Sequence, residues 1–162
     1  MSHADGLIHA DLHTSNIMAS RDKMKVIDME FAFMGPFGYD LGYLVGNLIS
    51  QYCAACFKRF PSEQSRKQFK AYLLATIKSL IETYMKTFTL CWEKSVKERY
   101  RGQQGLLQSI LQEVMEDVPG YASMVNWFRS VSEIPYPDFD IIEDKDAKRN
   151  ATVLSLMIDW GI

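Results

Sequence analysis

A run of polar, chemically active side chains lies near the start of the chain, in the stretch IHADLHTSNIM at residues 8–18. Its His9, Asp11 and Asn16 fit the pattern H-x-D-x-x-x-x-N. In phosphoryl transfer of the kinase type, the aspartate of this pattern accepts or orients the proton of the attacking hydroxyl, and the asparagine offers its amide oxygen to Mg²⁺. The spacing therefore predicts Asp11 as a catalytic base and Asn16 as a metal ligand. We expect His9 to be packed and hydrogen-bonded, holding the loop.

Two further carboxylates, Asp28 and Glu30, follow the strand-like run Lys25-Val26-Ile27. In an extended segment, residues two apart face the same side, so both carboxylates would point the same way. Such a pair can share a divalent ion that bridges the β- and γ-phosphates of a nucleotide. An isolated pair more often marks a solvated strand end, but its combination with the preceding loop pattern favours phosphotransferase ancestry and predicts Asp28 and Glu30 as metal ligands.

Short strands and several helices must position these side chains. Strands are predicted at 7–9 and 24–27, with a polar turn at 20–23, and Gly35-Pro36-Phe37-Gly38 breaks the chain. Apolar residues then recur every three or four positions, which indicates helices. The first expected helix begins near residue 40, and the second begins after the N-cap Ser62 and is interrupted at Gly102 and Gly105. Three more are expected, one from about 106 to Pro119-Gly120, one at 121–132 that Pro135 follows as a break, and one at 144–160.

The second of these helices carries an apolar stripe from Phe69 to Phe88, which we expect to be core. The fold class is therefore predicted as mainly α with a small β-hairpin. One domain is expected over 1–162, with the loop and metal motif at 6–42 and a helical bundle at 40–162.

The composition argues against binding to nucleic acid, against a membrane span and against secretion. A net charge of −2 and a pI of about 5.9 argue against a nucleic-acid-binding surface. No apolar run reaches the roughly 18 residues of a membrane span, and the start lacks the pattern of a signal peptide. Three cysteines, an odd and low count, favour reduced thiols and a cytoplasmic location.

The segments LIHADLHTSNIM and KVIDMEFAFMGPFGYDLGYLVGNLI resemble the C-terminal lobe of the 5-methylthioribose kinase family, in the aminoglycoside-phosphotransferase-like branch of the protein-kinase fold. The likeness is dense over 6–50, becomes sparse through the helices and reappears around Pro119-Gly120-Tyr121 and Asp138-Phe139. It implies ATP- and Mg²⁺-dependent phosphorylation of the sugar 1-hydroxyl in methionine salvage. It also implies that Asp11 touches the sugar, that Asp28, Met29 and Glu30 contact the nucleotide, and that Asp40 braces the loop.

The chain departs from the family pattern at several positions. Ala10 stands where the family usually has glycine. Phe128 replaces the first of two arginines that help to hold the sugar and the transferred phosphate, so only Arg129 remains as the implied substrate-binding residue. Phenylalanine cannot supply the planar fork of donors that arginine offers to a phosphate.

The chain also lacks a Gly-rich phosphate loop and a strand lysine, which the resemblance places in an N-terminal lobe before Met1. We therefore expect residues 1–162 alone to be inactive and to expose an apolar surface that would favour a homodimer. Two alternatives stay open: a non-catalytic lobe that acts as a binding module, and a small-molecule kinase of the same fold with another acceptor.

Overall fold

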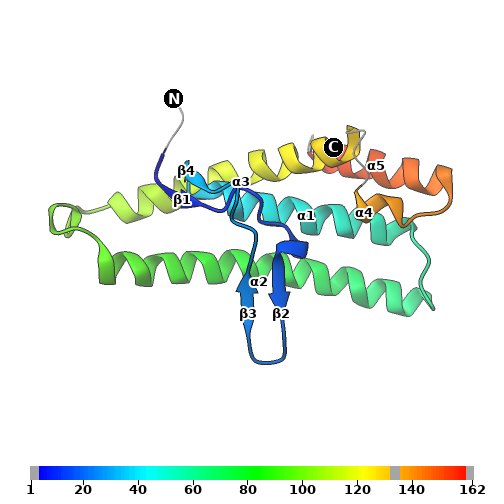
Figure 1. Ribbon diagram of the computed structural model, residues 1–162, viewed down its shortest axis with the longest axis horizontal. Coiled ribbons are helices and arrows are strands. Elements are labelled where there is room, and N and C mark those ends of the chain that lie inside the picture. The colour runs from blue at the N-terminus through cyan, green and yellow to red at the C-terminus, as the bar shows by residue number, and fades with distance from the viewer. Residues whose placement is uncertain (1–3, 132–135, 160–162) are drawn as a thin grey trace.

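Long helices make up most of the molecule, and the strands lie to one side of them (Figure 1). The structure, a computed structural model, describes residues 4–131 and 136–159. Its α-helices are α1 (Gly38–Phe57), α2 (Glu63–Ser95), α3 (Leu106–Val131), α4 (Pro137–Asp140) and α5 (Lys145–Asp159), and short 3-10 turns cover Thr14–Asn16 and Glu98–Tyr100. The predicted mainly α fold class is confirmed.

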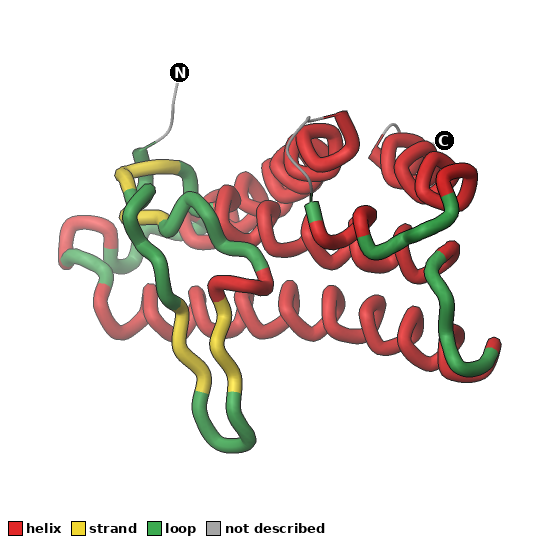
Figure 2. Tube along the Cα trace, turned by 45° about the vertical axis from the view of Figure 1, so that its right-hand side comes forward, coloured by secondary structure: helices red, strands yellow, loops and turns green. Residues whose placement is uncertain are grey.

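The strands form two separate two-stranded antiparallel sheets. Strand β1 (Gly6–Ile8) pairs with β4 (Phe33–Gly35), and β2 (Ile17–Ala19) pairs with β3 (Met24–Val26) to form the hairpin that projects from the helices in Figures 1 and 2. The segments 7–9 and 24–27, both predicted as strands, therefore belong to different sheets. The prediction missed β4, because its Phe-Met-Gly sequence lies beside the Gly-Pro break.

Helix α1 is the centre of the helical part and packs against α2, α3 and α5. One core cluster joins Leu41 and Val45 of α1 to three buried side chains of α3, namely Val114, Val118 and Ala122. A second joins Cys53 and Ala54 to Phe139, Ile142 and Ala151. The hydrophobic faces of α1 therefore fix the helix that directly follows the predicted metal motif.

Two glycines of α1 allow α3 to approach closely. A Cβ atom on Gly42 would lie 2.6 Å from Cβ of Tyr121, and one on Gly46 would lie 2.7 Å from the carbonyl oxygen of Ala122. Real Cβ atoms essentially never make contacts this short. The backbones of α1 and α3 meet along this seam because no side chain separates them.

The expectation that Pro119-Gly120 ends a helix is wrong, because α3 continues through Pro119 to Val131. A proline inside a helix removes one backbone hydrogen bond and costs about 3 kcal/mol. Pro119 and Gly120 are exposed, whereas Val114, Val118 and Val125 on the other face are buried against α1. Burial of each such side chain contributes about 1.5–3 kcal/mol, so the packed face outweighs the proline.

The apolar stripe of α2 is core only in part. Leu73 is buried and Ile77, Leu80, Ile81 and Tyr84 pack against the first cluster, but Tyr72 is 63% exposed. The local signals proved more reliable. The Ser62 side chain accepts a hydrogen bond from the backbone of Ser65 as an N-cap, and both Gly102 and Gly105 have positive φ angles. The predicted helix ends at 132 and 160 and the break at Pro135 lie outside the described residues.

Candidate functional site

Asp40, in the first turn of α1, holds the backbone of the predicted catalytic loop. Its two carboxylate oxygens accept hydrogen bonds from the backbone nitrogens of His9, at 2.7 Å, and Ala10, at 2.9 Å. The predicted role of Asp40 as a brace is confirmed. Ala10 has a φ of +66°, in the left-handed region that favours glycine. The two bonds to Asp40 hold this unfavourable conformation in place.

His9 is a structural part of the loop, as predicted. Its side chain is buried, its Nδ1 accepts a hydrogen bond from the backbone of Asp11 at 3.3 Å, and its Nε2 lies 2.8 Å from the carbonyl oxygen of Ile27. The ring therefore accepts at Nδ1 and donates at Nε2. His9 thereby ties the loop to the segment that leads into Asp28.

Asp11 lies within this loop, and three side chains that can donate hydrogen bonds lie close to its carboxylate. The hydroxyl of Tyr43 donates to Oδ1 over 3.1 Å, and Nδ2 of Asn16 donates to Oδ2 over 3.2 Å. Nε2 of His13 lies 3.4 Å from Oδ2. Burial, and next the charge of Asp11, raise the pKa of Tyr43 far above its ordinary value, so this hydroxyl stays protonated. These contacts fix the direction in which the carboxylate points.

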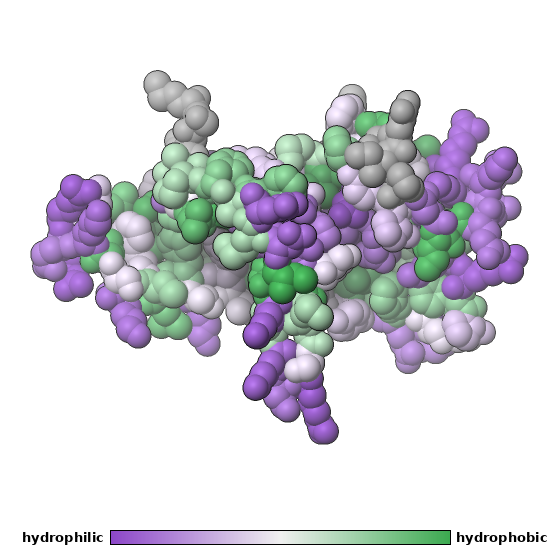
Figure 3. All heavy atoms as spheres, in the orientation of Figure 1, coloured by the Kyte–Doolittle hydropathy of each residue, from purple (hydrophilic) through white to green (hydrophobic). Residues whose placement is uncertain are grey.

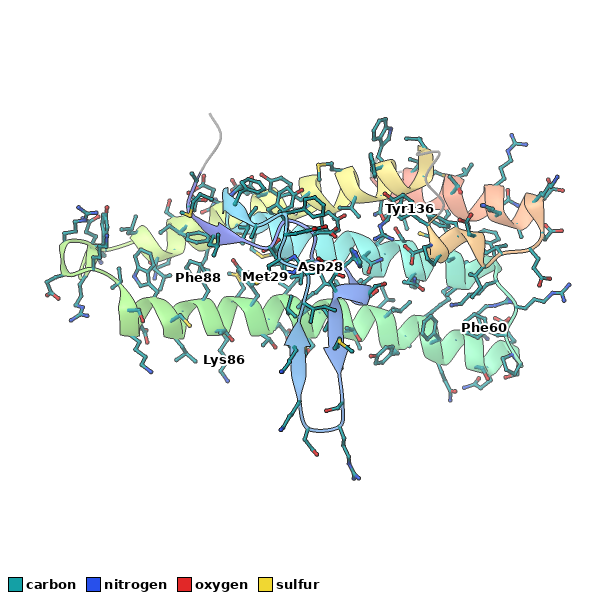
Figure 4. The ribbon with its side chains drawn as sticks, in the orientation of Figure 1. Asp28, Met29, Phe60, Lys86, Phe88 and Tyr136 are labelled. Carbon is teal, nitrogen blue, oxygen red and sulfur yellow. The ribbon has the colours of Figure 1, made fainter. Side chains whose placement is uncertain are left out.

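The structure brings Asn16 and Asp28 close together. Asn16 is buried, donates through Nδ2 to the backbone carbonyl of Asp11 at 3.0 Å, and accepts at its own carbonyl a hydrogen bond of 3.0 Å from the backbone of Ile27. Ile27 directly precedes Asp28, which Figure 4 shows beside Met29 where the chain leaves the hairpin. The two halves of the predicted metal set, distant in sequence, therefore become neighbours through β2 and β3.

The expectation that Asp28 and Glu30 face the same side of an extended segment is wrong. Asp28 has a φ of +66° and is not extended, and the backbone of Ala32 bonds to the carbonyl of Met29 at 3.1 Å, which closes a turn through Glu30. Both carboxylates are exposed. Within residues 4–131 and 136–159, no group of three or more His, Cys, Asp or Glu side chains could hold a metal ion.

Arg129 lies in the same cavity as Asp11. This cavity, of about 480 Å³, lies between the catalytic loop, α1, the end of α3 and α4, and it is lined by Asp11, His13, Thr14, Ser15, Tyr43, Asn47, Gln51, Arg129, Tyr136, Pro137 and Asp138. The guanidinium forms an ion pair with the carboxylate of Asp138, and both side chains are buried. Its Cζ lies 4.8 Å from the centre of the Tyr136 ring, which Figure 4 labels.

A smaller and more apolar cavity, of about 270 Å³, adjoins the first, and both share Tyr43, Arg129 and Tyr136. Phe128 lines only the smaller one and meets Tyr136 edge to face, with the ring centres 6.1 Å apart. Phe128 is therefore part of an aromatic wall of the smaller cavity, which Arg129 also lines.

Sequence reasoning missed Tyr43, Asn47, Gln51, Tyr136 and Asp138. A signal existed for the first three, because positions 43, 47 and 51 repeat every four residues and so share one face of a helix that is otherwise apolar. No local periodicity marks Tyr136 or Asp138, and the resemblance at Asp138-Phe139 carried no role for Asp138. Their role depends on the return of α4 to the start of α1, which only the tertiary structure brings about.

No helix in the described part of the chain has both the length and the apolar character needed to cross a membrane.

Several exposed apolar side chains gather at the hairpin formed by β2 and β3. Met18, Met24, Val26, Ile27 and Met29 on and after the hairpin are exposed, and Figure 3 shows hydrophobic surface at the root of the hairpin and hydrophilic surface at its tip.

Comparison with known proteins finds sequence similarity to phosphotransferases. The sequence pattern of the phosphotransferase enzyme family matches residues 2–80. A methylthioribose kinase of Geobacillus thermodenitrificans is 35% identical over 155 residues, which are 93% of this chain and 37% of the relative. One of Exiguobacterium sibiricum is 31% identical over 144 residues, 89% of this chain and 34% of the relative.

One of Pectobacterium atrosepticum is 30% identical over 148 residues, 91% of this chain and 36% of the relative. The chain thus spans little more than a third of the length of these relatives. Residues 2–80 are similar to the phosphotransferase enzyme family, the chain as a whole is similar to part of these methylthioribose kinases, and the described residues have the mainly α fold expected of a kinase-like C-terminal lobe.

Proposed function

We propose that the chain forms the acceptor side of an ATP-dependent kinase that phosphorylates the 1-hydroxyl of 5-methylthioribose, a reaction of methionine salvage in the cytoplasm. The observation that carries the proposal is the position of the Asp11 carboxylate. It is oriented by Tyr43 and Asn16 and faces a cavity of about 480 Å³ that also holds the buried cation of Arg129. That cavity offers one group to activate a hydroxyl and one to attract a phosphate.

In the proposed reaction, Asp11 orients the sugar hydroxyl and accepts its proton. The hydroxyl oxygen forms a bond to the γ-phosphorus of ATP, the bond from that phosphorus to the bridging oxygen breaks, and ADP leaves. Arg129 attracts the sugar or the transferred phosphate at the edge of the cavity. Phosphoryl transfer depends mostly on such positioning and charge stabilisation.

The residues near Asp28 suit Mg²⁺, which prefers oxygen ligands and is often held by one or two carboxylates together with the phosphates of the substrate. Asp28, Glu30 and the amide oxygen of Asn16 supply such oxygens, and Met29 would contact the nucleotide. When bound, Mg²⁺ neutralises the charge that develops on the β- and γ-phosphates. Two carboxylates that protrude into solvent fit a site completed by the nucleotide.

The test is an assay of the full-length protein that contains this chain, with Mg²⁺–ATP and 5-methylthioribose and detection of the sugar 1-phosphate. Replacing Asp11 by Asn should lower kcat by about 10²–10⁴-fold, the usual contribution of a positioned base. Asp22→Asn is the matched control, since Asp22 lies exposed in the turn between β2 and β3. Equal activity of the two variants would refute the assignment of Asp11.

We also propose that residues 1–162 by themselves have no useful turnover, because the sequence contains no Gly-rich loop to clamp the phosphates. Loss of a single preorganised charge-stabilising donor already costs about 10²–10³-fold in kcat. Turnover by this chain alone in the ordinary enzyme range of about 1–10³ per second would contradict the proposal.

Another acceptor is the second candidate, and the aromatic wall of the smaller cavity favours it. Phe128 gives that cavity an apolar lining where the family pattern has an arginine. If the acceptor is methylthioribose, Phe128→Arg should raise activity on this sugar. If instead both forms of the protein prefer another alcohol, the acceptor is different while the reaction class stands.

A further inference from the structure

One buried carboxylate collects hydrogen bonds from two other helices. Asp138 of α4 is buried and accepts from the guanidinium of Arg129 on α3 and from the side-chain amides of Gln51 and Asn47 on α1, the last at 3.3 Å. We call these four side chains the Asp138 cluster. Arg129 lines the same cavity of about 480 Å³ as Asp11, so the hydrogen bonds of the cluster fix the position of the guanidinium in that cavity.

The same cluster reaches the catalytic loop. Asn47 is 2% exposed, and while its Nδ2 donates to Asp138, its Oδ1 accepts a hydrogen bond of 2.9 Å from the backbone nitrogen of Thr14. Thr14 begins the turn that ends at Asn16, whose amide in turn bonds to Asp11. Hydrogen bonds from Arg129 to Thr14, and from Asn16 to Asp11, together with the short backbone turn from Thr14 to Asn16, therefore connect Arg129 with the carboxylate of the predicted base.

Asp138 also compensates the positive charge of Arg129. Arg129 is buried, and its Nε has no hydrogen-bond partner within the described residues, so the guanidinium depends on Asp138 for compensation of its charge. Asp11 is the other carboxylate lining the same cavity, and both Asp11 and Arg129 act electrostatically on Tyr43 between them. Without Asp138, the predicted base would be the one carboxylate of the described residues left in the lining of this cavity to compensate the charge of Arg129.

We propose that Asp138 is a positioning residue that fixes the guanidinium of Arg129 and the Thr14 turn of the catalytic loop relative to each other, and keeps Arg129 away from Asp11. The inference rests on the proposed function for its kinetic consequences only. Its structural content, the coupling of α4 to the backbone of Thr14 through Asn47, holds whatever the acceptor is.

The experiment compares Asp138→Asn with Asp140→Asn in the full-length protein. Asp140 lies on the same short helix and pairs with Lys148, but its side chain is 34% exposed and belongs to neither cavity. We expect Asp138→Asn to lower kcat by about a hundredfold, the size of effect that a 1 Å misplacement can have, with little change in the KM for ATP. Hydrogen exchange of the Thr14 amide, measured by NMR, should become faster in Asp138→Asn and stay unchanged in Asp140→Asn.

A second variant guards against loss of the fold. Asn47→Leu keeps the Arg129–Asp138 pair but removes both hydrogen bonds of Asn47, the one to Asp138 and the one from Thr14. It should therefore speed the exchange of the Thr14 amide and lower kcat while the ion pair remains. If Asp138→Asn does not fold, this variant decides the question. Unchanged Thr14 exchange in a folded Asp138→Asn or Asn47→Leu variant overturns the proposal, and so does a kcat equal to that of Asp140→Asn.

The exchange measurement separates this inference from the proposed function. If the unsubstituted protein phosphorylates none of the tested alcohols, the proposed function fails, yet faster exchange at Thr14 still supports the coupling. If the protein is an active kinase but Thr14 exchange and kcat are the same in all variants, the positioning role fails and the proposed function stands.

Discussion

The hydroxyl of Tyr43 donates a hydrogen bond to Oδ1 of Asp11 across 3.1 Å, and this contact joins helix α1 to the loop that carries the predicted base. The bond has a fixed direction, because burial and the neighbouring carboxylate raise the pKa of Tyr43 and keep its proton in place. Asp11 is therefore the acceptor in this bond, and the contact at its Oδ1 holds the orientation of the carboxylate.

Replacing Tyr43 by Phe removes this bond and leaves the ring in its cavity. A hydrogen bond to a charged group contributes about 1.5–3 kcal/mol, so kcat/KM for phosphoryl transfer should fall by roughly ten- to a hundredfold. Steady-state kinetics of the full-length protein measures this. Tyr72→Phe is the control, because Tyr72 is 63% exposed on α2. If both variants retain full activity, the orientation of Asp11 does not depend on Tyr43.

Replacing Asp28 by Asn should abolish Mg²⁺-dependent binding of ATP, since the loss of one anionic oxygen weakens a site that has few protein ligands. Titration calorimetry of residues 1–162 with ATP, with and without Mg²⁺, tests this, and weak binding is expected for the unsubstituted chain. Asp22→Asn should bind as the unsubstituted chain does. Equal binding by the Asp28 variant would remove Asp28 from the metal site.

Two glycine substitutions should have opposite effects on stability. Gly42→Ala forces a Cβ atom to within 2.6 Å of Tyr121, so we expect the free energy of unfolding to fall by about 1–3 kcal/mol, as in overpacked cores. Gly120 lies in helix α3 and has no atom within 4 Å of an added Cβ, so Gly120→Ala should raise it by about 0.5–1 kcal/mol. Urea unfolding of the two variants measures both changes. Similar losses in both would show that α1 and α3 are not packed along Gly42.

Stability should decrease above pH 10, in part through Tyr84. Its hydroxyl donates to the carbonyl of Phe37 at 3.0 Å, and burial, followed by the charge of Asp40, raises its pKa to about 12. Between 10.0, the ordinary tyrosine value, and about 12, the unfolded chain loses this proton while the folded chain keeps it. The folded state then binds more protons, so the free energy of unfolding falls as pH rises.

Denaturant unfolding at several pH values between about 8 and 12, around the ordinary tyrosine pKa, checks this prediction. Tyr84→Phe should show a shallower decline than the unsubstituted chain, whereas Tyr72→Phe should follow it. The decline should not vanish in Tyr84→Phe, because burial also raises the pKa of Tyr39 and Tyr43. Identical curves for all three proteins would refute a role for Tyr84.

The sequence by itself determined the features that depend on neighbouring residues. The H-x-D-x-x-x-x-N spacing placed Asp11 and Asn16 in one loop, where they do form a hydrogen bond. Ser62 marked the start of α2, and the apolar periodicity after Asp40 marked α1. Such signals are reliable because a cap, a turn or a helical face is set by interactions within a few residues.

Only the tertiary structure decided which distant residues meet. The pairing of β1 with β4, the passage of α3 through Pro119 and the ion pair between Arg129 and Asp138 all depend on packing between elements, which local propensity does not encode. Asp28 shows the same limit. Its left-handed backbone is held among the contacts that His9 and Asn16 make with Ile27, and these contacts overrode the extended geometry that the spacing of its carboxylates suggested.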